Sequence, residues 1–144
     1  MAILAVWIVS FFAPALADGS YALPGYRAAL FSGLGLFLAA RNLISGDHSD
    51  ILYLLYVGSF CFANVFMILA PIALRDLRRG RGKAFLVLMT FWDLLTFSWF
   101  YFVHFRGDVG PIHFGWWMWE ASLFAMTAFL SIVWFQAQGR PVER

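Results

Sequence analysis

Charged side chains are scarce in this chain of 144 residues, because Asp, Glu, Lys and Arg together make up only 12% of it. Soluble domains carry about 25%. Cysteine is nearly absent as well, and the single Cys61 excludes an internal disulfide and a zinc site built from several cysteines. The sequence also has no glycine-rich phosphate loop and no nucleophile-elbow motif. These absences remove the common patterns of nucleotide-dependent and acyl-transfer enzymes.

Apolar residues dominate the composition, since 62% of the chain is hydrophobic and 20% is aromatic. A chain of this length cannot hide so many large apolar side chains in one core, so we expect a lipid bilayer to solvate them. Helices are expected, because lipid offers the backbone no hydrogen-bond partners. The sequence therefore predicts one all-α domain over residues 1–144, a polytopic transmembrane helix bundle. Its five expected spans are Ala2–Ala17, Tyr26–Ile44, Ile51–Leu74, Ala84–Phe105 and Ile112–Phe135.

The first of these spans is the shortest and contains Pro14. It ends in a small-residue pattern before Asp18 that is typical of a signal-peptidase site, but no basic residue precedes it. We therefore interpret it as a retained span. If residues 2–17 lie on the membrane surface instead, four spans remain.

Basic residues predict the orientation of the bundle. Five of the ten Lys and Arg residues lie between the third and fourth spans: Arg75, Arg78, Arg79, Arg81 and Lys83. Basic loops stay on the cytoplasmic side, so we expect the amino terminus outside, the carboxyl terminus inside, and a plasma (inner) membrane location. The net charge of +2 comes from this local cluster, so it does not indicate nucleic-acid binding.

Two acids interrupt the last two expected spans. Asp93 lies in the fourth and Glu120 in the fifth. An ionised side chain at the centre of a bilayer costs about 2.5–3.5 kcal/mol on insertion scales, so such acids face the interior of a bundle. At about 100° per residue, Thr90 falls on the side of Asp93 and Thr127 on the side of Glu120. The sequence predicts that the two acids face each other from neighbouring antiparallel helices.

Asn64 in the third span is expected at a similar depth and completes the candidate site. Three interpretations of this site stay open. The polar residues form a structural hydrogen-bond network in which an acid is protonated, or they handle a proton or another cation, or they bind a ligand or cofactor.

The three histidines, His48, His104 and His113, are all expected on the outer side of the membrane. Asp47, Asp50 and Asp108 lie in the adjoining loops. Imidazole and carboxylate groups bind zinc, copper or iron, and two histidines can hold a haem. No tight metal-binding spacing accompanies them, so the cofactor stays unknown, with a metal ion or haem as the candidates.

Small residues recur on one face of two expected helices, at Ala28, Ser32, Gly35 and Ala39 and at Ala121, Ala125 and Ala128. Such faces let helices pack closely, within one chain or between chains. Trp116, Trp117 and Trp119 fit an aromatic belt at the outer interface.

Three functions stay open. The first is a non-enzymatic subunit of a larger membrane complex or homo-oligomer, with other membrane subunits or copies of itself as partners. The second is a proton- or ion-linked transporter or channel component that uses Asp93 and Glu120. The third is a membrane redox or metal-dependent enzyme with an outward-facing His/Asp site.

Overall fold

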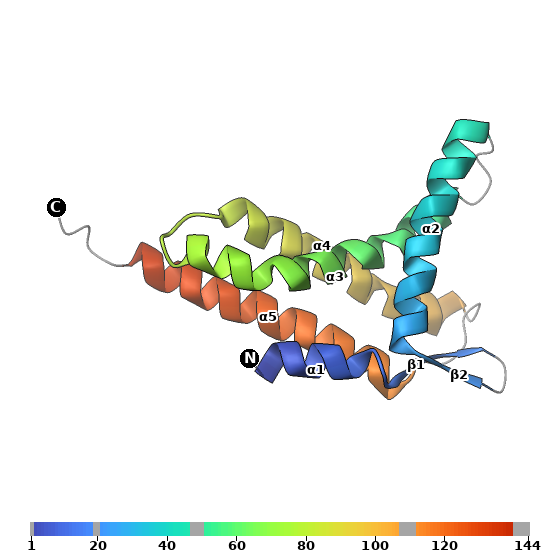
Figure 1. Ribbon diagram of the computed structural model, residues 1–144, viewed down its shortest axis with the longest axis horizontal. Coiled ribbons are helices and arrows are strands. Elements are labelled where there is room, and N and C mark those ends of the chain that lie inside the picture. Colours follow the sequence, from blue (N-terminus) through green and yellow to red (C-terminus); the bar gives the residue numbers. More distant parts are fainter. Residues whose placement is uncertain (1, 19–20, 47–50, 107–111, 140–144) are drawn as a thin grey trace.

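The computed structural model describes residues 2–18, 21–46, 51–106 and 112–139 (Figure 1). Five helices and one β-hairpin make up this part of the chain. In sequence order they are α1 (Ala2–Ser10), β1 (Pro14–Asp18), β2 (Tyr21–Pro24), α2 (Gly25–Ser45), α3 (Ile51–Leu77), α4 (Lys83–Arg106) and α5 (Phe114–Gln138).

The expected helices over 26–44, 51–74, 84–105 and 112–135 are confirmed, and their observed ends differ from the predicted ones by three residues or fewer. Glycines mark the ends of two of them. Gly46, after α2, has a φ of 73°, and Gly80 and Gly82, between α3 and α4, have φ values of 70° and 83°. Glycine adopts this left-handed conformation without the steric cost that a Cβ atom imposes, so it ends helices and forms tight turns.

The prediction of a first helix over residues 2–17 is wrong. Helix α1 ends at Ser10, whose hydroxyl donates to the carbonyl of Trp7 at 2.6 Å. Pro14 has no N–H and disfavours helical backbone at the residue before it, so the chain turns and enters β1. Strand β1 pairs with β2 as an antiparallel hairpin. At about 1.5 Å per residue, the nine residues of α1 are far too short to cross a bilayer.

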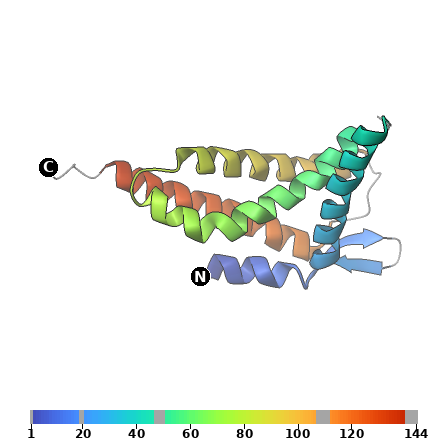
Figure 2. The same ribbon diagram turned by 45° about the horizontal axis from the view of Figure 1, so that its top comes forward.

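Helices α3, α4 and α5 lie side by side, α1 packs beside α5, and α2 crosses the end of this group at a steep angle (Figures 1 and 2). The small-residue face of α2 contacts α3, with Ser32, Gly35 and Ala39 buried. A Cβ atom on Gly35 would lie 3.2 Å from the carbonyl oxygen of Leu54, so the two backbones meet closely at this point. The face of α5 that carries Ala121, Ala125 and Ala128 is exposed. The small-residue face of α2 therefore serves packing within the chain, and that of α5 does not.

The basic turn between α3 and α4 and the β-hairpin lie at opposite ends of the bundle. At one end, the Gln138 amide donates to the Gly80 carbonyl at 2.9 Å, which places the basic turn beside the carboxyl end of α5. At the other end, the His113 backbone N–H donates to the Ala15 carbonyl at 2.9 Å, which places the hairpin beside the start of α5. The five-span prediction put the connection between the first two spans on the same side as the basic turn. The observed hairpin lies at the opposite end, because α1 runs beside α5 toward the start of that helix and the chain enters β1 there (Figure 1).

Gly115 allows α5 to begin against the backbone at the start of β1. A Cβ atom at this position would lie 2.7 Å from the carbonyl oxygens of both Ala13 and Pro14, which are backbone atoms with little freedom to move. We expect Gly115→Ala to lower the free energy of unfolding by about 1–3 kcal/mol, the usual cost of overpacking. Gly33→Ala is the matched control, because the nearest atom to its Cβ would be Cys61 Sγ at 3.7 Å. Thermal unfolding in detergent, followed by circular dichroism, compares the two. Equal melting temperatures for both variants would contradict this close approach.

Three helices of the described part, Gly25–Ser45, Tyr53–Leu77 and Phe114–Gln138, are long and apolar enough to cross a membrane. Large apolar side chains cover much of the outer surface. Ile44 is 89% exposed and Ile72 is 69% exposed, whereas Asp93 and Glu120 are 1% and 2% exposed. This distribution is the reverse of that in water-soluble proteins, in which acids are almost never fully buried.

Candidate functional site

Asp93 of α4 and Thr127 of α5 join the two helices inside the bundle. Both side chains are buried, and the Thr127 hydroxyl donates a hydrogen bond to Asp93 Oδ2. The sequence prediction that these acid-bearing faces meet is confirmed at this contact.

Glu120 of α5 makes the reciprocal contact with α4. The Thr96 hydroxyl lies 3.3 Å from Glu120 Oε1 and 3.0 Å from the Asp93 carbonyl oxygen, so the two acceptors share its single proton. Thr96 is fully buried. Each helix thus supplies one acid and one threonine, and each threonine donates to the acid of the other helix.

One oxygen of each acid is left over. Asp93 Oδ1 and Glu120 Oε2 are buried and have no hydrogen-bond partner among the described residues. The two carboxyl groups are also close enough for their charges to interact. A buried polar atom without a partner typically costs about 1–3 kcal/mol, and two ionised acids in one interface would also repel each other. A proton or a cation in the α4–α5 interface would satisfy these two oxygens and reduce the repulsion between the acids.

Asn64 of α3 belongs to a different contact. Its side-chain oxygen accepts from the indole N–H of Trp119 at 2.8 Å and from that of Trp7 at 3.3 Å. Its amide donates to the Phe60 carbonyl at 3.2 Å. Asn64 thereby ties α1 and α5 to α3 and has no direct hydrogen bond to either acid. Trp119, which the sequence placed in an aromatic belt, is 8% exposed and faces the interior of the bundle.

The remaining predicted site residues have different positions. Thr90 is exposed on α4. His113 is half-buried and precedes α5 as its N-cap residue, without a side-chain capping bond. His48 and the loop acids Asp47, Asp50 and Asp108 lie outside the described residues, as does the side chain of His104. Within the described ranges, no group of three or more His, Cys, Asp or Glu side chains is placed to hold a metal ion.

A further polar contact lies close to the acids. The Tyr56 hydroxyl of α3 is 2.6 Å from the Ser98 hydroxyl of α4 and donates to the Leu95 carbonyl at 3.2 Å. Tyr56 also lies within electrostatic range of Glu120. The sequence pattern did not single out this pair. Its only signal is that Ser98, like Thr96, is a polar residue close to Asp93 on an apolar helix.

Comparison with protein-family models, curated proteins and solved structures found no match to this chain. The chemistry of the buried polar groups is therefore the ground on which a function is inferred.

The threonine contacts give a direct test of this geometry. Thr127→Val keeps the side-chain volume but leaves both oxygens of Asp93 without a donor. We expect this variant to lose about 1–2 kcal/mol of unfolding free energy, since hydrogen bonds to charged or strongly polar groups contribute about that much. Thr90→Val, on the exposed side of the same acid, should leave the stability unchanged. Denaturation in mixed micelles of mild detergent and sodium dodecyl sulfate measures both. A larger loss for Thr90→Val than for Thr127→Val would show that the Asp93 side chain does not face Thr127.

Proposed function

We propose that this chain is a non-enzymatic component of a membrane assembly and that its Asp93–Glu120 pair binds and releases a proton or a small cation. The observation that carries this proposal is the pair of buried carboxyl oxygens, Asp93 Oδ1 and Glu120 Oε2, that have no partner among the described residues. Acids in membrane-spanning helices are costly and commonly mark ion or proton pathways.

The inverted polarity of the molecule supports the proposed membrane setting. Phe37 and Ile72 are 65% and 69% exposed, while Thr96 is fully buried. In water such a surface would aggregate, and in lipid it is the expected outer face of a bundle. Helix α4, with 24 residues, has the length to cross beside α3 and α5.

The orientation is part of the proposal. The turn between α3 and α4 contains Arg78, Arg79 and Arg81, and by the positive-inside rule it faces the cytoplasm of a plasma (inner) membrane. The carboxyl end of α5 lies beside this turn and is therefore inside too. The hairpin lies at the other end of α5 and faces outward.

We include an assembly in the proposal because three long helices side by side are too few to enclose an ion pathway. The alanines at 121, 125 and 128 form an exposed face on α5, the helix that also contacts α1, α3 and α4. Small residues allow a further helix to approach closely, and that helix belongs to a second copy or to another membrane subunit. Mass measurement of the protein in mild detergent distinguishes these two partners from a lone monomer, and a stable monomer would remove the assembly from the proposal.

Proton exchange is tested in liposomes that contain the purified protein. An imposed pH difference should drive proton movement that Asp93→Asn removes, because asparagine keeps an oxygen for Thr127 but has no exchangeable acid proton. Wild-type liposomes that hold a pH difference as long as protein-free liposomes would contradict the proposal.

The reciprocal Thr–carboxyl contacts favour a second candidate, in which the acids only lock α4 to α5. Each of the two acids accepts from the opposite helix, as a packing device would require. In that case Asp93→Asn leaves both stability and proton movement unchanged, and Asp93→Leu lowers stability. The proton-movement measurement alone therefore separates the two candidates.

A further inference from the structure

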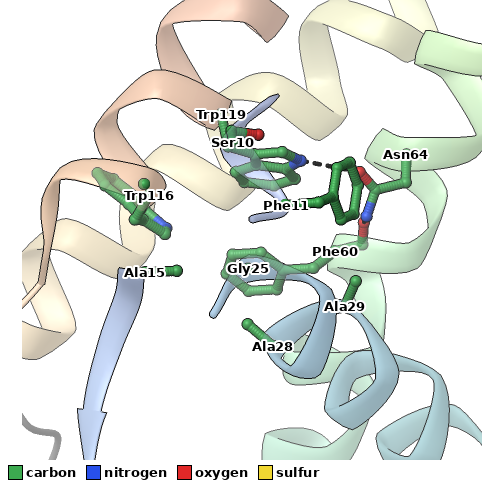
Figure 3. Close-up of a pocket in the computed structure, with 11 residues that line it drawn as sticks. Ser10, Phe11, Ala15, Gly25, Ala28, Ala29, Phe60, Asn64, Trp116 and Trp119 are labelled. Carbon is green, nitrogen blue, oxygen red and sulfur yellow. Dashed lines mark hydrogen bonds between the residues drawn. The ribbon is translucent and has the colours of Figure 1, made fainter. Parts of the chain in front are cut away.

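A small cavity lies between the first turns of α2 and α5, the corner after α1, and the middle of α3 (Figure 3). Its volume is about 50 Å³. The residues that matter for its chemistry are Ser10, Gly25, Ala28, Asn64, Trp116 and Trp119. The lining is apolar apart from a few polar atoms, and neither Asp93 nor Glu120 contributes to it, so this space is separate from the acid pair.

Trp116 presents an unused hydrogen-bond donor to this cavity. The residue is 5% exposed, and its indole Nε1 is buried without a partner among the described residues. The ring nitrogen lies on the side of the indole that faces the cavity (Figure 3). The other polar groups nearby are occupied. The indole N–H of Trp119 donates to Asn64, and the Ser10 hydroxyl donates to the Trp7 carbonyl.

A larger space adjoins the cavity between α2 and α3. It has a volume of about 350 Å³, and Ala28, Phe60 and Trp116 line both spaces. Its outer wall includes Phe31 and Tyr53, which are 54% and 55% exposed, so it opens on the surface that we assign to lipid. The combination of an apolar groove with one polar donor at its inner end is typical of sites for small amphipathic molecules.

We propose that the groove and the cavity together bind a neutral lipid that carries a carbonyl group, with its apolar chain between α2 and α3 and its carbonyl oxygen accepting from Trp116 Nε1. Indole N–H is only a donor, so the occupant must supply an acceptor. No Asp, Glu, Lys, Arg or His side chain lines either space, and an ionised headgroup would lose its hydration there without compensation. A neutral ketone or ester fits these conditions. This inference is independent of the acid pair.

Water is the rival occupant, because a cavity needs only about 10–15 Å³ of such volume to hold one molecule. The two occupants differ in what they require of the groove. A water molecule bonds to Trp116 whether or not the groove is filled, whereas a lipid carbonyl reaches Trp116 only if its chain occupies the groove.

Nuclear magnetic resonance of the indole N–H groups tests the proposal on the full chain in detergent micelles. The seven tryptophans give seven indole signals, and Trp116→Phe identifies that of Trp116 by its loss. Added methyl undecyl ketone should shift the Trp116 signal in a saturable manner. Tridecane, which has the same chain length but no acceptor, should leave it in place. An equal shift with tridecane, or no shift with the ketone, would overturn the proposal, and the second result would assign the cavity to water.

Affinity provides the second readout, with the signal of Trp119 followed as the ketone is added. Trp116→Phe should weaken binding about twofold to tenfold, the value of one hydrogen bond. Trp134→Phe is the matched control, because Trp134 lies on the same helix and also has a buried, unpartnered Nε1, but it lines neither space.

Ala28→Leu fills the junction of the two spaces and should abolish the ketone-dependent shift while leaving the helical circular dichroism intact. Unchanged affinity in both Trp116→Phe and Ala28→Leu would place the ketone elsewhere and contradict the proposal.

Discussion

Replacing Glu120 by glutamine is expected to reduce pH-driven proton movement in liposomes to the level of protein-free membranes. In the wild type, the Thr96 hydroxyl lies 3.3 Å from Glu120 Oε1. Glutamine keeps the shape of the side chain and an oxygen that can accept from Thr96. What it removes is the exchangeable proton and the charge interaction with Asp93. The amide NH2 group takes the place of Oε2, which is already buried without a partner, so the folded state should persist at close to wild-type stability.

The controls for Glu120→Gln separate proton exchange from general damage. Thr90→Val changes an exposed position on α4 and should conduct as the wild type does. Melting temperatures of both variants, measured in the same detergent, report folding. If Glu120→Gln is fully folded and still dissipates the pH difference at the wild-type rate, Glu120 has no part in proton exchange.

Asn64→Leu is expected to lower the free energy of unfolding strongly, because one side-chain oxygen satisfies two indole donors. Leucine has a similar volume but no acceptor, so the indole N–H groups of Trp7 and Trp119 would both be left in an apolar interior. Unsatisfied buried donors typically cost about 1–3 kcal/mol in water-soluble proteins, and side-chain hydrogen bonds between membrane helices average about 0.6 kcal/mol. We therefore expect a loss of about 1–3 kcal/mol for the two contacts together.

A double-mutant cycle isolates the stronger of these contacts. Trp119→Phe removes only the donor that lies 2.8 Å from Asn64 Oδ1, and the combined variant with Asn64→Leu should be less destabilised than the sum of the two single changes. Unfolding in mixed micelles gives all three values. Strict additivity would show that Asn64 and Trp119 do not interact in the folded protein.

The pairing of the two acid-bearing faces could be predicted from sequence because the cost of a buried charge is large. It forces Asp93 and Glu120 inward, and the short connection between their helices makes them antiparallel neighbours. The choice between Thr90 and Thr96 could not be made in this way. Both lie three residues from Asp93, about 60° to either side of it at 100° per residue, and the rotation of α4 against α5 selects Thr96.

The expected depth of Asn64 in the membrane did not identify its contacts correctly. Its distance along α3 matches that of the acids, but its side chain accepts from α1 and α5 instead of meeting α4. Helical phase within one helix does not reveal which neighbour a face will meet when three helices surround it. The role of Trp7 was hidden for the same reason, since a tryptophan in an apolar helix has no distinctive pattern.

The first segment shows where hydropathy misleads. Residues 2–17 are apolar enough to suggest one long helix, and hydropathy does not distinguish a helix from a short buried strand. Pro14 was the available signal, because it ends the helical backbone before it. The hairpin that follows depends on long-range contacts, such as that of Ala15 with His113, which no local pattern encodes.

Infrared difference spectroscopy of the protein in membranes tests most directly whether the Asp93–Glu120 pair exchanges a proton. We predict a carbonyl band from a protonated carboxyl group that weakens as the pH is raised while the protein stays folded, and that changes in both Asp93→Asn and Glu120→Gln. A wild-type spectrum without a pH-dependent carboxyl band, or with a band that both variants leave unchanged, would contradict it.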